Sequence, residues 1–263
     1  MRLQKPSPEK WITLNGLDIS YVSDFAMDGF KSDIFEAHQH WFSSTVERPY
    51  IIDAGANTGC VTLYLKQLYP NADVICFEPD ADIFHLLEQN IKANALSGTT
   101  LFNCALGDYD GSSHFYTSKA KHLSGGLGNS IKPVWGIQEH LSQYDTTMKV
   151  PIRRLSRFIN RPVDYLKLDV EGAELDILNE ISTRIHHVKQ LHVEVHCLGS
   201  QPDIVFNHLS RFLDKHKFYT LVERYQATLP RWVQRWNDGS KPSIWSIRAV
   251  NSRFFTTDQL TAK

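Results

Sequence analysis

The 263-residue sequence is poor in cysteine. Its four cysteines, Cys60, Cys76, Cys104 and Cys197, form no C-x-x-C pair, which argues against a zinc ribbon or a thioredoxin-like redox site. We therefore expect four small, buried, apolar side chains, in keeping with a protein of a reducing compartment.

Long apolar runs are absent as well. No stretch approaches the ~18 consecutive apolar residues of a transmembrane helix. The N-terminal residues MRLQKPSPEKW lack the apolar core of a secretory signal peptide. Together these absences predict a soluble, cytoplasmic protein without a membrane partner.

An excess of charge of one sign is the third missing feature. The formal net charge is −1, and the only basic cluster lies near Arg231 and Arg235. Nucleic-acid-binding proteins usually carry a basic balance or a basic stripe, so we expect no nucleic-acid partner. The sequence leaves the oligomeric state open.

The residues that are present have the composition of an ordinary globular protein, and the length fits one α/β domain with additions. Residues 1–48 are expected to form an N-terminal cap. It would consist of a hairpin around Asn15-Gly16, within residues 11–22, and a helix over residues 30–46. Residues 49–263 would then form the main domain.

Short apolar strands and amphipathic helices alternate along the main domain, which is typical of parallel βαβ units. The predicted strands are residues 50–54, 74–77, 99–106, 163–170 and 190–197, followed by a closing pair at 219–224 and 244–250. The predicted helices are residues 61–68, 81–94, 173–185 and 203–216.

Two segments break this alternation. The glycine-rich segment 107–150 is longer than loops without a function usually are. We therefore expect a lid or a binding loop there, with strand pieces at 115–116 and 150–152. Residues 225–243 carry Trp232 and Trp236. With the cap, these segments are expected to line an aromatic pocket and to carry substrate choice.

The glycine turn in IIDAGANTGC, residues 51–60, carries the strongest chemical signal. Its pattern, Asp53-x-Gly55-x-x-x-Gly59, lacks the third glycine of the fingerprint that places a pyrophosphate on a helix N-terminus. A carboxylate at the end of the strand suits a cationic ligand group instead. Alternatively, Asp53 only anchors the turn through hydrogen bonds.

Glu78, in CFEPD, follows Gly59 by 19 residues and ends the second predicted strand. An acidic residue at about this spacing accepts hydrogen bonds from ribose hydroxyls. The turn and Glu78 together predict a ligand of the adenosine type that has a cationic centre.

Four segments resemble the FkbM family of methyltransferases: IIDAGANTGC, CFEPD, FNCALGD at 102–108 and YLKLDVEGAELDIL at 165–178. The resemblance covers residues 50 to about 200, and its most specific part is LKLDVEGAE. It implies a Rossmann-like class I methyltransferase fold, α/β, with helices on both faces of a seven-stranded, mostly parallel sheet whose last strand is antiparallel. It also implies S-adenosylmethionine as the methyl donor.

By the same resemblance, the glycine turn would surround the methionine part of the donor, Glu78 would hold the ribose, and the residues from Asn103 to Gly107 would line the adenine. The residues expected to bind the donor are Asp53, Gly55, Ala56, Asn57, Thr58, Gly59, Glu78, Pro79, Asp80, Asn103, Ala105, Leu106 and Asp169.

The catalytic candidates are Asp169, Glu194 and His196, because open α/β sheets bind ligands at the carboxyl ends of their strands. An alcohol acceptor must lose its proton, and His196 is the first candidate for the base. Asp169 is the second candidate, or it orients His196. Alternatively, His196 is a strand-end residue that forms a hydrogen bond with a neighbour and has no catalytic role.

Three charged residues near the candidates are given structural roles. Lys167 is expected to pair with a carboxylate, and Glu171 and Glu174 to complement a helix N-terminus. No metal is expected. A divalent ion on Asp169, Glu194 and His196 is the alternative, which the histidine weakens because magnesium prefers oxygen ligands.

The function expected from the sequence is methyl transfer to a hydroxyl of a small metabolite, natural product or sugar. A carboxylate or nitrogen acceptor, for example on a peptide natural product, stays open, so the partner would be a small molecule or a peptide. Alternatives of another class are an NAD-dependent oxidoreductase, which would need the missing glycine, and a non-catalytic nucleotide-binding module.

Overall fold

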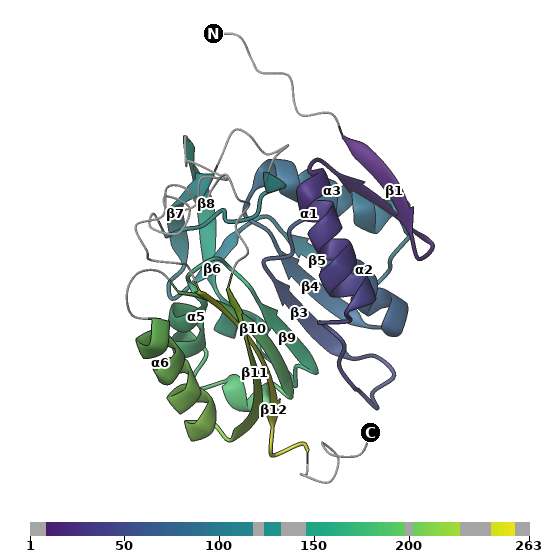
Figure 1. Ribbon diagram of the computed structural model, residues 1–263. Helices are drawn as coiled ribbons and strands as arrows, with labels where there is room; N and C mark the ends of the chain where they lie inside the picture. Colours follow the sequence, from purple (N-terminus) through teal and green to yellow (C-terminus); the bar gives the residue numbers. More distant parts are fainter. Residues whose placement is uncertain (1–8, 118–123, 133–145, 198–201, 227–242, 256–263) are drawn as a thin grey trace.

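The central element of the protein is a seven-stranded sheet of order β11-β12-β10-β9-β3-β4-β5 (Figure 1). The computed structural model describes residues 9–117, 124–132, 146–197, 202–226 and 243–255. The strands are β3 (Tyr50–Ala54), β4 (Asp73–Phe77), β5 (Thr99–Phe102), β9 (Tyr165–Leu168), β10 (Gln190–Cys197), β11 (Phe218–Gln226) and β12 (Ser243–Asn251). Only β12 runs against its neighbours, which confirms the class I methyltransferase sheet.

Helices cover both faces of this sheet (Figure 1). One face carries α2 (Cys60–Leu68) and α3 (Ala81–Ala93), and the other carries α5 (Glu174–Glu180) and α6 (Pro202–Lys215). Alternation along β3 divides the core, because Ile51 packs toward α2 and α3 whereas Ile52 packs toward α5 and α6. This two-sided burial explains why Tyr50, Ile51 and Ile52 follow one another as apolar residues in β3.

Several helix boundaries differ from prediction. The helix expected over 173–185 ends at Glu180 and is followed by a separate 3-10 turn, η3 (Ile185–His187). A further 3-10 turn, η2 (Leu155–Phe158), precedes β9. None of the helices in the described residues is long and apolar enough to cross a membrane.

The strand predicted over residues 99–106 is wrong in its extent. β5 ends at Phe102, and β6 (Ala105–Gly107) joins a second sheet of order β6-β8-β7, with β7 (Gly111–Thr117) and β8 (Thr146–Arg154). The chain turns at Asn103, whose side chain donates to the carbonyl of Glu78 at 2.8 Å. The expected strand pieces at 115–116 and 150–152 lie within β7 and β8.

The N-terminal hairpin is confirmed as β1 (Lys10–Leu14) and β2 (Leu17–Tyr21), joined by Asn15 and Gly16 with positive φ. The helix expected over 30–46 is wrong: α1 (Asp24–Phe30) starts earlier, and the π-helical turn η1 (Lys31–Glu36) ends the helical part. Ser23 caps α1 through a bond from the amide of Ala26 at 3.3 Å, a start signal that the apolar spacing does not show.

The cap packs on the main domain through the buried side chain of Asn90 on α3. Asn90 accepts from the amide of Ser20 at 2.6 Å and donates to the carbonyls of Ser20 at 3.0 Å and Thr58 at 2.7 Å. Cap residues also share one apolar cluster with β3 and α2. The cap and the glycine turn are therefore held by one side chain.

Asn90→Ala is expected to lower the free energy of unfolding by about 2–3 kcal/mol, since buried backbone groups lose their partners. Asn94→Ala is the matched control, because Asn94 bonds the amide and carbonyl of Asp18 in the same way at a more exposed position. Its expected cost is below about 1 kcal/mol. Urea denaturation measures both, and equal costs would contradict the role assigned to Asn90.

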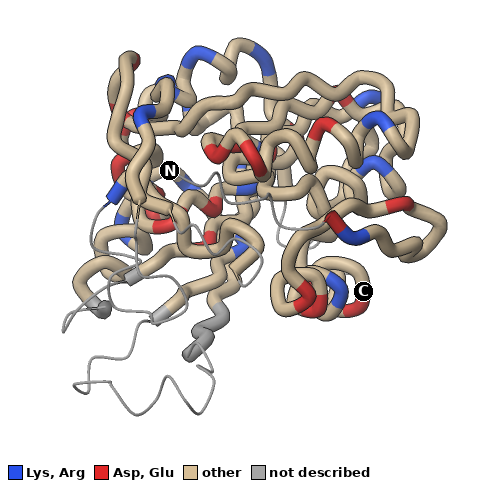
Figure 2. Tube along the Cα trace, turned by 90° about the horizontal axis from the view of Figure 1, so that it is seen from above, with Lys and Arg blue, Asp and Glu red and all other residues tan. Residues whose placement is uncertain are grey.

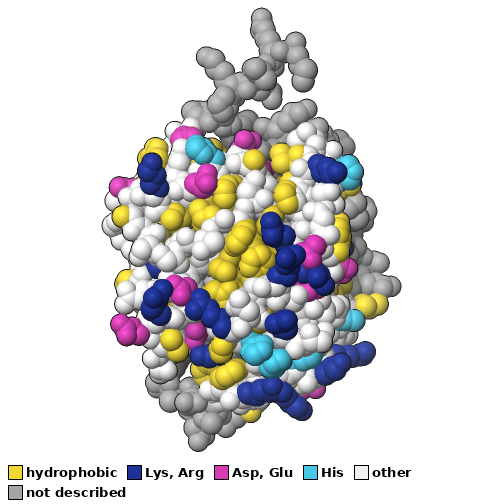
Figure 3. All heavy atoms as spheres, turned by 180° about the vertical axis from the view of Figure 1, so that it is seen from behind, with side chains coloured by type: hydrophobic (Ala, Val, Ile, Leu, Met, Phe, Trp, Pro, Cys, Tyr) yellow, Lys and Arg dark blue, Asp and Glu magenta, His cyan; other side chains and the backbone are white. Residues whose placement is uncertain are grey.

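The surface seen in Figure 3 carries apolar side chains in a band beside Lys and Arg.

Cys60, Cys76 and Cys104 are buried, as expected, and have free thiols. The side chain of Cys197 and residues 227–242, with Arg231, Trp232, Arg235 and Trp236, lie outside the described residues.

Candidate active site

A cavity of about 600 Å³ opens at the carboxyl ends of the parallel strands, between the cap and the two sheets. Its volume lies in the range of small-molecule sites, ~300–1,000 Å³. Eight of the thirteen residues expected to bind the donor line it, and they are Gly55, Ala56, Asn57, Glu78, Pro79, Ala105, Leu106 and Asp169. The structure thus brings the glycine turn, Glu78 and the end of β9 into one space.

The other five expected donor residues, Asp53, Thr58, Gly59, Asp80 and Asn103, do not line the cavity. Asp53 is fully buried, accepts from the hydroxyl of Thr62 at 2.7 Å and lies 3.6 Å from the ammonium of Lys167. Asp80 caps α3 through a bond from the amide of Asp82 at 3.0 Å. The side chains of Asp53 and Asp80 therefore support the residues that line the cavity, without lining it themselves.

Gly55 shows why the turn needs glycine. Its φ is +82°, and a Cβ built there would lie 1.8 Å from the carbonyl oxygen of Asp169. Only a residue without a side chain lets β3 and β9 approach so closely. The resulting cradle fits a ligand that packs against bare backbone.

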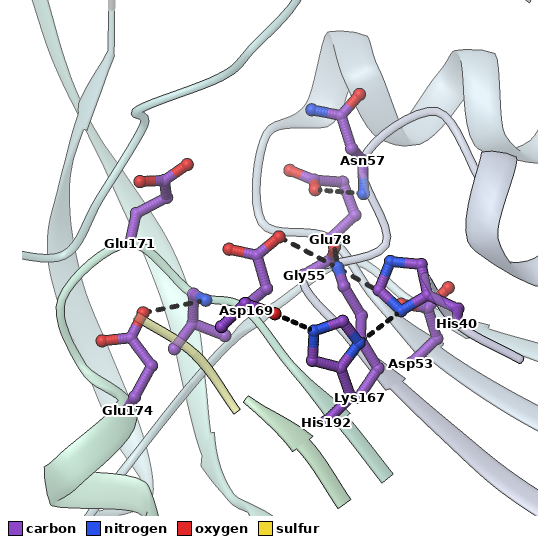
Figure 4. Close-up of polar contacts among 12 residues, drawn as sticks. His40, Asp53, Gly55, Asn57, Glu78, Lys167, Asp169, Glu171, Glu174 and His192 are labelled. Carbon is purple, nitrogen blue, oxygen red and sulfur yellow. Dashed lines mark hydrogen bonds and ion pairs between the residues drawn. The ribbon is translucent and has the colours of Figure 1, made fainter. Parts of the chain in front are cut away.

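Glu78 is buried yet lines the cavity. One carboxylate oxygen accepts from the amide of Asn57 at 2.9 Å, a bond drawn in Figure 4, and the other accepts from the amide of Asp80 at 2.8 Å. Burial, followed by the charge of Asp80, raises the pKa of Glu78 to about 8. A buried carboxylate facing a cavity is suited to bind hydroxyl donors.

The predicted catalytic residues Asp169, Glu194 and His196 also line this cavity. Lys167 pairs with carboxylates as expected, at 3.4 Å from Asp169 and 3.6 Å from Asp53, and donates to the carbonyl of Gly55. Burial opposes its charge, but Asp169 and Asp53 outweigh burial and raise the pKa of Lys167. Burial and then Asp169 raise the pKa of Glu194 to about 8.

His196 has a carboxylate at each ring nitrogen. Nδ1 lies 2.9 Å from Glu174, and Nε2 lies 3.2 Å from Glu171 and 3.9 Å from Asp169. Burial alone would lower the pKa of His196, but Glu171 and Glu174 outweigh it and raise that pKa well above its usual value. A charged imidazole has no lone pair for a proton, so its role as the base stays a prediction that this geometry does not favour.

Glu171 is a cavity residue to which the sequence assigned only a structural role at a helix N-terminus. Glu174 fills the expected structural role, since its carboxylate accepts from the amide of Gly172 at 2.9 Å. Glu171 instead lines the cavity, where burial raises its pKa to about 7. Its φ of +58° could not be read from a helix-start pattern. Figure 4 draws Asp169 between the glycine turn and these two glutamates.

His40, from the cap, is a second residue that sequence reasoning missed. It is buried and lines the cavity, and its Nδ1 lies 2.9 Å from Nδ1 of His192 on β10 (Figure 4). The same nitrogen lies 3.1 Å from the hydroxyl of Tyr165. Burial, followed by His192, holds the pKa of His40 well below its usual value. No local pattern could reveal this pair, because its members are 152 positions apart.

The cap and residues 124–131 complete the cavity wall. Phe25, Phe30 and Asp33 from the cap line it, as do several residues of 124–131. The latter segment is fixed at two points, because Asn57 donates to the carbonyl of Gly125 at 3.1 Å and the amide of Gly128 donates to Glu171 at 3.0 Å. The expected lining by the cap and the glycine-rich segment is confirmed in these residues.

Residues 53–219, more than half of the chain, match the family model described as the methyltransferase FkbM domain. The chain belongs to the FkbM methyltransferase family. It is therefore an S-adenosylmethionine-dependent methyltransferase. This assignment takes the place of the two alternative interpretations of the sequence, an NAD-dependent oxidoreductase and a non-catalytic nucleotide-binding module.

Relatives support this family. The chain is 32% identical over 198 residues to Methyltransferase 1 of Beauveria bassiana, covering 70% of this chain and 76% of the relative. It is 32% identical over 143 residues to the 2-O-methyltransferase NoeI of Sinorhizobium fredii, covering 49% and 56%.

The fold has counterparts among solved structures. A transferase from Pyrococcus horikoshii superimposes with a TM-score of 0.50 at 12% identity, over 94% of this chain and 73% of that one. At this identity the likeness concerns the fold alone.

Proposed function

We propose that this FkbM-family protein transfers the methyl group of S-adenosylmethionine to a hydroxyl of a small molecule such as a metabolite, a natural product or a sugar. The observation that carries the proposal is the single cavity shared by Gly55, Glu78, Asp169 and His196. Methyl transfer needs the donor and the acceptor oxygen aligned within one enclosed space.

On the donor side, Glu78 would accept the ribose hydroxyls, and the turn from Gly55 to Asn57 would lie against the methionine part. The apolar Ala105 and Leu106 would face the adenine. When bound, S-adenosylmethionine supplies an activated methyl group on a sulfonium. Five of the expected donor residues would stabilise the turn and the ends of β4 and β5 without lining the cavity. These residues are Asp53, Thr58, Gly59, Asp80 and Asn103.

On the acceptor side, Asp169 is the best-placed group to take the hydroxyl proton. Its side chain is 27% exposed, against 18% for Glu171 and 4% for His196. The cationic groups of Lys167 and His196 lie 3.4 and 3.9 Å from its carboxylate and hold it at this edge of the cavity. Asp169 thus takes the role first assigned to His196, with Glu194 on the same wall.

Two further observations support a hydroxyl acceptor. The relative from Sinorhizobium fredii is named as a 2-O-methyltransferase. The cap side of the cavity combines Phe25 and Phe30 with Asp28 and Asp33, which suits an uncharged molecule with an apolar face better than an anion. Along the described trace, Lys and Arg are scattered among Asp and Glu (Figure 2), in keeping with a small-molecule partner.

Transfer of a deuterated methyl group tests the proposal. The protein is incubated with S-adenosyl-[methyl-²H₃]methionine and matched acceptors that present a hydroxyl, an amine or a carboxylate on the same scaffold. Mass spectrometry and NMR are expected to place the label on oxygen of the alcohol. Label on nitrogen or on a carboxylate would replace the hydroxyl by the alternative acceptor.

Donor binding is expected to depend on pH through Glu78. In the free protein the pKa of about 8 keeps this carboxyl protonated at pH 7, and ribose hydroxyls would favour its ionised form. Binding of S-adenosylhomocysteine should therefore release a proton below pH 8, and affinity should rise from pH 6 to pH 8. Calorimetry in two buffers with different ionisation enthalpies measures this release, which Glu78→Gln should abolish.

The same raised pKa predicts the opposite trend for stability without ligand. Folding favours the protonated form of Glu78, since its folded pKa of about 8 lies above the unfolded value of ~4.3. The contribution of Glu78 is complete below the unfolded pKa and is lost as pH rises through about 8. Thermal unfolding of the wild type and of Glu78→Gln from pH 5 to pH 9 should converge at low pH.

A further inference from the structure

We propose that Asp169, Glu171 and His196 bind a divalent metal ion on the acceptor side of the cavity. One atom from each residue, two carboxylate oxygens and an imidazole nitrogen, lies within 4.8 Å of the others. The inference goes beyond the proposed function, which describes the protein without a metal. With the ion bound, His196 would be neutral and Asp169 would act on the acceptor hydroxyl through the ion, not as the proton acceptor itself.

The spacing of the ligand atoms fits a metal. Ligands ~2.1 Å from one ion at angles between tetrahedral and octahedral lie about 3.0–3.4 Å apart. Nε2 of His196 is 3.2 Å from Glu171 and 3.9 Å from Asp169. The first distance already fits, and a small rotation of the partly exposed Asp169 brings in the second.

The imidazole is held as a metal-bound histidine usually is. Metal-bound histidines almost always give their second ring nitrogen to a carboxylate or carbonyl, which fixes the tautomer and the ring. Nδ1 of His196 lies 2.9 Å from Glu174, which is almost fully buried and is itself held by the amide of Gly172. This arrangement directs Nε2 to the two carboxylates, and Glu174 is not one of the ligand residues.

Glu171 supplies a separate observation. Its Oε2 receives no hydrogen bond within the described part of the chain and faces Nε2 of His196 at 3.2 Å, whereas Oε1 accepts from the amide of Gly128 at 3.0 Å. A divalent ion between Oε2 and Nε2 would replace the imidazole proton, because histidine binds metal in its neutral form. The left-handed backbone of Glu171, φ +58°, is itself a strained conformation that recurs at functional sites.

The donor set favours a borderline metal such as Mn²⁺ or Zn²⁺ over Mg²⁺, because imidazole is one of the ligands. The cavity side of the cluster stays open, so water or an acceptor oxygen could complete the coordination. The site differs from the alternative considered on the sequence, since Glu171 takes the place of Glu194. It also revises the expectation that no metal binds.

Manganese alone is the probe that tests the site. Protein stripped with EDTA is titrated with Mn²⁺ without donor or acceptor, and electron paramagnetic resonance follows the free ion. One site per chain is expected in the wild type, with affinity at least about tenfold weaker in Glu171→Gln and Asp169→Asn. Asp33→Asn, on the cap side of the same cavity, should bind Mn²⁺ like the wild type.

A second measurement does not depend on the variants folding. Electron spin-echo modulation of bound Mn²⁺ should show coupling to a ¹⁴N nucleus, the imidazole of His196. Absence of a saturable site, absence of that coupling, or loss of binding in Glu194→Gln but not in Glu171→Gln would each overturn the assignment.

Thermal shift with S-adenosylhomocysteine on the same samples separates this proposal from the proposed function. Ligand at a hundred times its dissociation constant should stabilise the protein by ~2.7 kcal/mol. Stabilisation and hydroxyl methylation without Mn²⁺ binding would remove only the metal site. Mn²⁺ binding without either would remove only the proposed function.

Discussion

Glu78→Ala is expected to weaken the binding of S-adenosylhomocysteine by about 100- to 1,000-fold. Hydrogen bonds to a charged acceptor contribute ~1.5–3 kcal/mol each, and two ribose hydroxyls would lose their acceptor. Each 1.4 kcal/mol corresponds to a tenfold change in affinity. The carboxylate of Glu78 also holds the amides of Asn57 and Asp80, so the turn loosens as well.

Isothermal titration calorimetry at pH 8 measures the effect, with circular dichroism to confirm that the variant is folded. Glu78→Gln keeps one acceptor oxygen and should lose only about tenfold. Glu88→Ala is the matched control, because Glu88 lies on α3 with half of its side chain exposed. An unchanged dissociation constant for Glu78→Ala would show that the ribose does not lie at Glu78.

Lys167→Met is expected to lower the free energy of unfolding by about 3–5 kcal/mol. The substitution removes the only cation within 4.0 Å of Asp53 in the described residues and leaves that fully buried carboxylate without compensation. It also removes a donor to the carbonyl of Gly55. The glycine turn and the end of β9 depend on the same ammonium, so donor binding should weaken together with stability.

Chemical denaturation of the single and double variants distinguishes charge from packing. Lys167→Met combined with Asp53→Asn should recover a large part of the loss, because the buried charge is removed with its partner. Lys132→Met, which breaks a half-exposed pair with Asp176, should cost less than about 1 kcal/mol. If Lys167→Met is as stable as the wild type, the buried network does not support the turn.

Asp53 shows how the same residue can be important in a different way from the one predicted. Its place at the end of a strand, two positions before Gly55, predicted a carboxylate beside the ligand. In the structure it is fully buried against Thr62 and Lys167. The alternative considered on the sequence, an anchor for the turn, comes closer to what is observed. The spacing of residues in the sequence places Asp53 at the end of a strand, but it does not determine whether the side chain points into the cavity or into the core behind it.

The cap and Glu171 show the other kind of limit. The buried apolar residues Ile34 and Phe35 belong to the π-helical turn η1 and Phe42 to an irregular segment, although their spacing predicted one helix. Their burial is set by the surfaces on which they pack, since Phe35 contacts Tyr64 of α2 and Phe42 stacks on Tyr165 of β9. Glu171 lines the cavity because of a single left-handed residue after β9. No periodic pattern in the sequence marks the end of the helical part of the cap or the left-handed backbone of Glu171.

The sequence by itself determined the parallel βαβ units, the glycine turn, Glu78 as a cavity residue, and the meeting of Asp169, Glu194 and His196. These follow from local rules, namely strand and helix periods, turn chemistry and strand-end geometry. The family and the reversed last strand of the sheet were implied by the resemblance of four sequence segments to the FkbM methyltransferases. Only the tertiary structure decided that Asp53 pairs with Lys167, that Glu171 and Glu174 grip His196, and that the cap closes the cavity. Those contacts join residues far apart in the chain, and packing and charge compensation in three dimensions select them.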